Sequence, residues 1–265
     1  MESTKLFSPG SGVLLSKQPW KIRSINGLLW ICECQGTMEL FDLNLVKVDT
    51  IDLDDDVVGH IYDVLHVNAD DFVIAGQKGL YMFSLENKST ELLQAGVFKS
   101  ISRKDSTIFA FEYESAKIFC FEYESVHHRL TMTSTISPPL SVREKQFATI
   151  AVRNDEIFVC SMSDDKIYVL DLSGALLRTV GEPGNLTVGR LSYPMIAQQL
   201  PDGSLLVADH DNHRYQLLRA SDSTWEQVEV FGGMEFPRGG YYTDGKLFTA
   251  TYSDKNWLQV NVQQG

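Results

Sequence analysis

Cysteine, long apolar runs and helical periodicity are all scarce in this 265-residue sequence. Only 4 cysteines occur, which excludes a disulfide-stapled scaffold, and with no apolar leader after Met1 this predicts a reducing, cytoplasmic location. The longest apolar runs, such as residues 28–31, span about four residues, whereas a membrane-spanning helix needs roughly 20. We therefore expect no membrane contact and, because amphipathic helix patterns are missing, an all-β fold.

Short strand-like segments follow one another along the whole chain. They are rich in Val, Ile, Phe, Tyr and Leu, and turn residues such as Pro-Asp-Gly separate them. One segment recurs at intervals of 36–49 residues, which is the period of a four-stranded propeller blade and is too long for a sandwich. Its six copies begin at Leu29, Phe72, Ile108, Ile157, Leu205 and Leu247.

An aromatic residue or histidine stands 9–12 positions before each copy, where we expect the innermost strand of the blade to start. These residues are Trp20, His60, Phe98, Phe147, Tyr193 and Phe236. A repeated aromatic position is typical of a packing anchor, and we interpret Trp20 and Tyr193 in this way.

The repeat predicts a single domain over residues 1–265, a six-bladed β-propeller with four antiparallel strands in each blade. The expected blades are residues 20–53, 58–95, 97–137, 146–182, 191–231 and 235–262. The last blade reaches the end of the sequence after three strands. We therefore predict that residues 11–17 supply its fourth strand and close the ring, which removes an exposed sheet edge.

One repeat carries a recognisable signature. Tyr193-Pro194 is followed by PDGSLLVADHDNHRYQLL at residues 201–218, which resembles the NHL repeat. Overall the chain resembles the six-bladed NHL propeller at the C-terminus of animal tripartite-motif proteins. The resemblance implies a domain that selects targets for a ubiquitin ligase. It also matches Asp209 and Arg214 to the acidic and basic residues of the signature, which we expect to brace adjacent strands as a buried pair.

Candidate catalytic groups are few. Cys32 and Cys160 align with alanines of other repeats and are expected to fill the core between blades. Only His60 and His210 are expected near the mouth of the channel, which is too few for a metal-based catalyst. The sequence also has no phosphate-binding loop and no nucleophile elbow. We predict no enzyme, no metal and no cofactor. A metal-dependent lyase or hydrolase in the channel is the least favoured alternative.

Basic residues gather in the loops that lead into the innermost strands, although the net charge is −12. All these loops open on one face of a propeller, where Tyr241 and Tyr242 follow the flexible pair Gly239 and Gly240. The predicted binding residues are Lys21, Arg23, Lys99, Arg103, Arg143, Arg190, Arg238, Tyr241 and Tyr242. Other loops of that face are acidic, at Glu33, Glu112, Glu114, Asp164, Asp165, Asp211 and Asp254.

A face of mixed charge suits a protein partner better than a polyanion. We therefore predict a non-catalytic binding module that recognises a protein or peptide through the loop face at the channel mouth. Single-stranded RNA bound by the same face is the alternative, with cations on the phosphates and aromatic rings stacked on the bases. The isolated propeller is expected to be a monomer.

Overall fold

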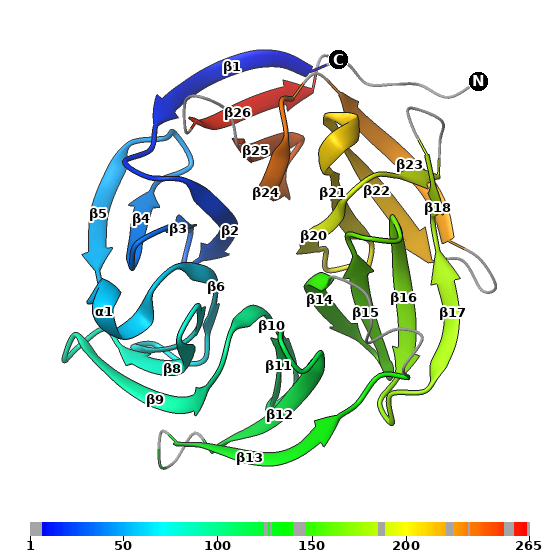
Figure 1. The fold of residues 1–265 in the computed structure, drawn as a ribbon. Coiled ribbons are helices and arrows are strands. Elements are labelled where there is room, and N and C mark those ends of the chain that lie inside the picture. Colours follow the sequence, from blue (N-terminus) through cyan, green and yellow to red (C-terminus); the bar gives the residue numbers. More distant parts are fainter. Residues whose placement is uncertain are drawn as a thin grey trace.

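A computed structural model shows a ring of six four-stranded antiparallel sheets around a central axis (Figure 1). The residues it describes are 7–124, 127, 129–139, 147–184, 189–220, 225–232, 234–251 and 257–263. In every blade the innermost strand lies nearest the axis, and each strand pairs with the next one in sequence, except that the outermost strand of the sixth blade comes from the N-terminal end of the chain. This confirms the predicted six-bladed propeller.

The first blade consists of β2 (Pro19–Ile25), β3 (Leu28–Glu33), β4 (Thr37–Phe41) and β5 (Lys47–Asp52). The second consists of β6 (Ile61–His66), β7 (Asp71–Gly76), β8 (Gly79–Ser84) and β9 (Ser89–Ala95). The third consists of β10 (Phe98–Lys104), β11 (Thr107–Glu112), β12 (Lys117–Glu124) and β13 (Arg129–Ile136). The fourth consists of β14 (Phe147–Arg153), β15 (Glu156–Ser161), β16 (Lys166–Asp171) and β17 (Leu176–Val180). The fifth consists of β20 (Pro194–Gln199), β21 (Leu205–Asp209), β22 (Arg214–Ala220) and β23 (Trp225–Gly232). The sixth is β24 (Pro237–Thr243), β25 (Lys246–Thr251), β26 (Trp257–Gln263) and β1 (Phe7–Leu14).

Little else is regular in the described part of the chain. One short helix, α1 (Asp55–Val58), lies between the first two blades, and a 3-10 turn, η1 (His210–Asn212), follows β21. A small parallel pair, β18 (Glu182–Pro183) and β19 (Arg190–Leu191), leads into the fifth blade. Neither helical element has the length or the apolar character that a membrane span requires.

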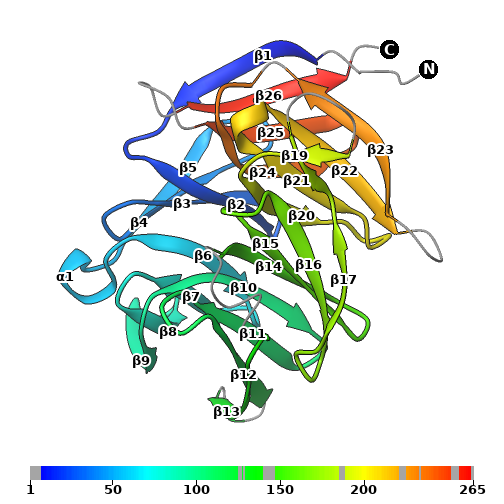
Figure 2. The ribbon, with the colours of Figure 1, turned by 45° about the vertical axis from the view of Figure 1, so that its right-hand side comes forward.

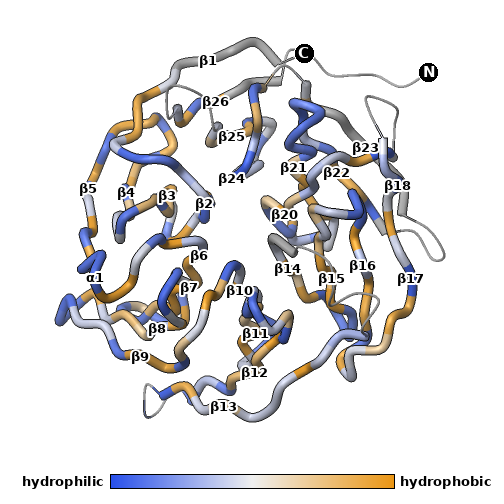
Figure 3. Tube along the Cα trace, viewed as in Figure 1, coloured by the Kyte–Doolittle hydropathy of each residue, from blue (hydrophilic) through white to orange (hydrophobic). Residues whose placement is uncertain are grey.

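The core consists of six apolar clusters, each of which lies between two neighbouring blades. The cluster between the sixth and first blades, for example, joins Phe248 and Leu258 to Ile22 and Leu29. Each sheet therefore packs against a cluster on both faces, and hydrophobic residues recur along middle strands such as β8, β12 and β15 (Figure 3). Cys32 and Cys160 are buried in these clusters, as predicted.

The ring closes where β1 pairs with β26, and the two strands lie side by side in both views (Figures 1 and 2). The predicted closure is confirmed, but the strand is Phe7–Leu14 rather than residues 11–17. The backbone N–H groups of Ser16 and Lys17 instead donate to the buried carboxylates of Glu39 and Glu33, at 3.3 Å each. These two residues therefore connect β1 to β2 and do not extend the sheet.

Deletion of residues 1–14 should lower the free energy of unfolding by about 3 kcal/mol or more. It removes the β1–β26 ladder, and each lost hydrogen bond contributes roughly 1 kcal/mol. Urea denaturation followed by tryptophan fluorescence measures the change. Deletion of residues 1–6 alone keeps β1 and serves as the control. Equal midpoints for the two shortened chains would show that β1 does not stabilise the ring.

Buried carboxylates at the ends of second strands pin the segments that lead into three blades. Asp209 accepts the backbone N–H of Ser192 at 2.6 Å, and Glu112 accepts that of Val97 at 3.3 Å. Glu33 does the same with Lys17 in the first blade. The acidic residues therefore fix where the inner strands begin.

Asp209 and Arg214 form the predicted brace in the fifth blade. Both are buried, and the Arg214 Nε donates to Asp209 Oδ2 at 2.7 Å. The same carboxylate accepts from the side-chain amides of Asn212 and Gln216. Arg214 also donates to the carbonyl of Arg190 at 2.8 Å. The pair therefore joins η1, β22 and β19.

Asp209→Ala should destabilise the fold by about 2–4 kcal/mol, because it leaves several buried donors and a buried guanidinium without their acceptor. Asp155→Ala is the matched control. Asp155 also pairs with a cation, Lys104, but is 83% exposed, and such surface pairs contribute about 0–1 kcal/mol. Chemical denaturation of both variants gives the comparison, and equal losses of stability would be evidence against the brace.

Candidate functional site

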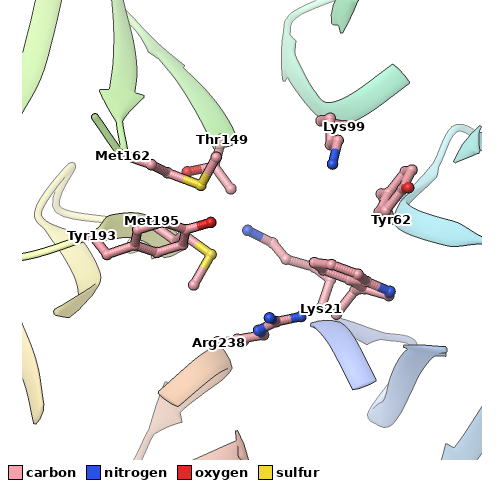
Figure 4. Close-up of a pocket in the computed structure, with 9 residues that line it drawn as sticks. Lys21, Tyr62, Lys99, Thr149, Met162, Tyr193, Met195 and Arg238 are labelled. Atoms are coloured by element: carbon pink, nitrogen blue, oxygen red, sulfur yellow. The ribbon is translucent and has the colours of Figure 1, made fainter. Parts of the chain in front are cut away.

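The six inner strands all begin at one end of the ring, and their first residues surround a pocket on the axis. The pocket encloses about 550 Å³, including the open space at its mouth. Every blade contributes to its wall, as the labelled side chains in Figure 4 show for most of it. The lining residues are Trp20, Lys21, Tyr62, Lys99, Thr149, Met162, Tyr193, Met195 and Arg238.

β-Bulges turn four of these side chains toward the axis. Pro19 and Lys21 of β2 pair with two adjacent residues of β3, Glu33 and Cys32. Trp20, which lies between them, is therefore the extra residue of the strand. The same irregularity makes Tyr62, Lys99 and Arg238 the extra residues of β6, β10 and β24. A bulged residue has no cross-strand partner, and its side chain is re-aimed. One backbone device, repeated around the ring, thus builds the pocket.

The bulges correct the predicted repeat of aromatic positions. Trp20 is structurally equivalent to Tyr62, Lys99 and Arg238, whereas Phe98 is equivalent to Pro19. Trp20 and Tyr193 also line the pocket, so packing between blades, the role expected of them, is only one of their two roles. The alignment was wrong because residue spacing alone does not reveal where a strand holds an extra residue.

Aromatic rings surround the cations of the pocket. The Lys99 Nζ lies 4.5 Å from the ring centroid of Tyr62, 4.7 Å from that of Tyr113 and 5.6 Å from that of Trp20. The Arg238 guanidinium lies 4.3 Å from the Trp20 centroid. Trp20 and Tyr62 meet edge to face at 5.1 Å. Cation–π contacts therefore hold these cations near the mouth.

Lys21 is the most buried of the three cations and points into the middle of the pocket (Figure 4). Its ammonium donates to the carbonyl of Ile196. Burial, and then the charge of Arg23, lower its pKa to about 8. Burial, and then Arg238, also lower the pKa of Lys99. Both ammonium groups are thus held in surroundings that disfavour their charge.

Farther along the channel, polar side chains join neighbouring inner strands. The Arg23 guanidinium forms two bonds of 2.8 Å with the Asp63 carboxylate and a third with the carbonyl of Ile101. Four side chains accept a backbone N–H of the next inner strand: Asp63 from Ile101, Ser100 from Ile150, Thr149 from Ile196 and Gln198 from Tyr242. These bonds satisfy groups that no sheet ladder reaches.

The structure brings together three of the nine predicted binding residues, Lys21, Lys99 and Arg238. Arg23 lies below them and is paired with Asp63. Arg103 lies at the opposite end of its strand, where it binds the carbonyls of Val67 and Asp105. The exposed Arg190 belongs to β19 and donates to the carbonyl of Pro183. Arg143 lies outside the described residues.

Tyr241 and Tyr242 do not line the pocket, which corrects their expected place at the channel mouth. Tyr241 packs into the apolar cluster between the sixth and first blades, and Tyr242 into the one between the fifth and sixth. The preceding glycines serve close packing rather than flexibility. A Cβ on Gly239 would lie 2.8 Å from the backbone nitrogen of Ile22, and one on Gly240 would meet the ring of Tyr215.

The structure also revises the expected balance of charge on this face. Of the acidic residues expected there, Glu114 and Asp211 are exposed, and Asp254 lies outside the described residues. Glu33 and Glu112 are buried and accept backbone N–H groups, and Asp165 accepts the N–H of Tyr193 at 2.7 Å. These carboxylates serve the fold. The described lining of the pocket contains three basic side chains and no acidic one.

The two histidines expected near the mouth do not converge. His60 belongs to the entry of the second blade, where its Nδ1 accepts the N–H of Gln35. His210 begins η1 in the fifth blade, across the ring, and its Nδ1 lies 2.6 Å from Asp211. Within the described ranges, no three metal-ligating side chains cluster.

The sequence matches no protein-family model and no curated protein. Its fold is similar to solved propellers. An auxiliary nutrient binding protein from Bacteroides ovatus aligns with a TM-score of 0.71 at 13% identity, over 98% of this chain and 77% of that one. The Pan2 WD40 domain of Neurospora crassa gives 0.61 at 10% identity, over 100% and 98%. Virginiamycin B lyase from Staphylococcus aureus gives 0.64 at 12% identity, over 97% and 99%. Such low identities establish the β-propeller fold alone.

Gly239→Ala should destabilise the fold by about 1–3 kcal/mol, because the added methyl would press β24 away from the backbone of β2. Gly232→Ala is the control, since a Cβ at that strand position meets no atom within 4 Å. Thermal denaturation of the two variants tests the difference. A Gly239→Ala protein as stable as the control would mean that the joint tolerates a wider spacing.

Proposed function

We propose that this protein is a non-catalytic recognition module that binds a protein partner at the channel mouth, with the axial pocket as the anchor point. The observation that carries the proposal is the pocket itself, where Trp20 and Arg238 are stacked on each other beside two further cations. Tryptophan, tyrosine and arginine are the residues that dominate protein–protein binding energies. The ring already holds these groups in place, so binding costs little conformational entropy.

The shape of the basic surface favours a protein over single-stranded RNA. RNA binding of this kind uses a track of cations that follows the backbone beyond one or two nucleotides. Here the three basic side chains of the pocket form one compact group, while Arg103 lies at the other end of the channel and Arg23 is neutralised by Asp63. A single pocket with a few converging polar groups and apolar walls suits one or two side chains of a peptide segment.

The same observations support a binding role over a catalytic one. The described lining offers no carboxylate, and its one aliphatic hydroxyl, that of Thr149, already accepts the N–H of Ile196. A nucleophile paired with a base is therefore not evident in the pocket. Among the structural neighbours, the nutrient-binding proteins favour binding and the lyase favours catalysis.

A finer form of the proposal is target selection for a tripartite-motif ubiquitin ligase in the cytoplasm. It rests on the signature-like repeat at residues 193–218 and, for the location, on the four free cysteine thiols.

Selection of random 12-residue peptides on the immobilised protein tests the protein-binding role. Selected peptides should bind in solution and lose about tenfold or more of their affinity to the Arg238→Gln variant, because a central anchor residue is removed. Fluorescence polarisation measures the affinities, and Lys88→Gln, which changes an exposed residue in the β8–β9 turn, is the control. Thermal midpoints show that both variants are folded.

Two results would contradict the proposal. One is a set of selected peptides that bind Arg238→Gln as tightly as they bind the unaltered protein. The other is submicromolar binding of mixed single-stranded RNA at about 50 mM salt that falls steeply as salt is added, which would place RNA first.

A further inference from the structure

The pocket holds more positive charge than the fold needs. The chain neutralises a channel cation one layer below, where Arg23 has a bidentate partner in Asp63. Lys21 and Lys99, by contrast, have no carboxylate within ion-pair distance among the described residues. Gathering like charges in a partly buried hollow costs free energy, which an anion bound there would offset.

The two ammonium groups keep donors available toward the hollow. Lys99 is held by the faces of Tyr62, Tyr113 and Trp20, and ring faces accept no conventional hydrogen bond that would occupy its N–H groups. Lys21 donates to one carbonyl, that of Ile196, out of the three donors that an ammonium has. Both groups point into the same space (Figure 4).

The opposite wall is largely apolar. Met162, Met195 and Tyr193 line it, and Figure 4 shows their side chains facing Lys21 and Lys99 across the hollow. Thioether groups and aromatic rings pack well against a planar apolar group. The hollow is open at its mouth, so a planar group can lie against this wall while its charged substituent reaches the ammonium groups.

We propose that the axial pocket is a binding site for an anionic group, a carboxylate or a phosphate monoester, that is joined directly to an aromatic or similarly flat apolar group. Lys21, Lys99 and Arg238 bind the anion, and Met162, Met195 and Tyr193 receive the apolar part. The proposal adds a class of ligand to the protein-binding function. It rests on that function only where it places the anion on a side chain of a protein partner.

Anion binding should take up protons near pH 8. Lys21 has a pKa of about 8 in the free protein, and a bound anion raises that pKa, so affinity should fall as pH rises from 7 to 9.5. Among the described residues, the other charged groups around Lys21 are Arg23, Asp63, Lys99 and Arg238. The thiols of Cys32 and Cys160 also face it, and burial raises their pKa values, so they stay neutral over this range.

Isothermal titration of the whole protein with phenyl phosphate and with benzoate, at low salt and pH 7.5, tests the site. One of the two or both should bind at one site per chain, and the pair distinguishes phosphate from carboxylate as the preferred anion. Inorganic phosphate should bind at least about tenfold more weakly than phenyl phosphate, because the apolar wall is unused. Benzylamine, which has the ring and the opposite charge, should not bind.

Lys99→Gln should weaken phenyl phosphate or benzoate binding about tenfold or more, while Lys88→Gln, with the same loss of charge at an exposed turn, leaves it unchanged. The apparent binding enthalpies in Tris and in HEPES at pH 8 should differ, because the buffer supplies the proton that the protein takes up and the two buffers have different enthalpies of ionisation. That readout needs no variant and therefore does not depend on how Lys99→Gln folds.

The outcomes separate this inference from the proposed function. Absence of binding by both aromatic anions at millimolar concentration, or equal binding by benzylamine, overturns the anion site. Binding that Lys99→Gln leaves unchanged overturns the assignment to this pocket. If the aromatic anions bind as expected but no peptide is selected, the anion site stands and the protein-binding function fails.

Discussion

The joint between the first and the last blade is the constraint on which the rest of this structure depends. A ring of six sheets exists only if β24 can approach β2, and Gly239 permits this because no side chain stands between the two backbones. The Tyr215 hydroxyl donates to the carbonyl of Gly239 at 2.7 Å and holds the strand there. The same joint stacks Arg238 on Trp20. The approach of β24 to β2 therefore both closes the ring and completes the wall of the pocket.

The distribution of charge follows from how the fold uses its acidic residues. The protein carries a net charge of −12, yet the described lining of its axial pocket is basic. Several carboxylates that belong to this end of the ring are turned inward, where they accept backbone N–H groups at the entries of the blades. Lys21 and Lys99 are held by a carbonyl and by aromatic rings, and neither forms an ion pair with a carboxylate of the described residues. The net charge of the chain is thus a poor guide to the charge of this surface, because several acidic side chains have structural roles.

Part of the candidate site could be predicted and part could not. The loops that enter the inner strands could be assigned to one face, because the repeat fixes the direction of every strand, and Lys21, Lys99 and Arg238 were found in this way. Tyr62, Thr149, Met162 and Met195 were missed, since as single residues in apolar segments they look like core residues. Arg103 was misplaced because it stands at the far end of β10. Tyr241 and Tyr242 were misplaced because both faces of β24 are packed between blades.

The sequence by itself determined the architecture. Blades covered on both faces need apolar strands at a constant period, and antiparallel neighbours in the chain pair locally, so six repeats predict six blades and their approximate limits. Only the tertiary structure decided which side chains meet on the axis. One extra residue in an inner strand turns Trp20, Tyr62, Lys99 and Arg238 toward one another. A bulge adds a single residue without changing the composition of its strand, and one residue cannot be detected in a repeat whose interval already varies from 36 to 49 residues.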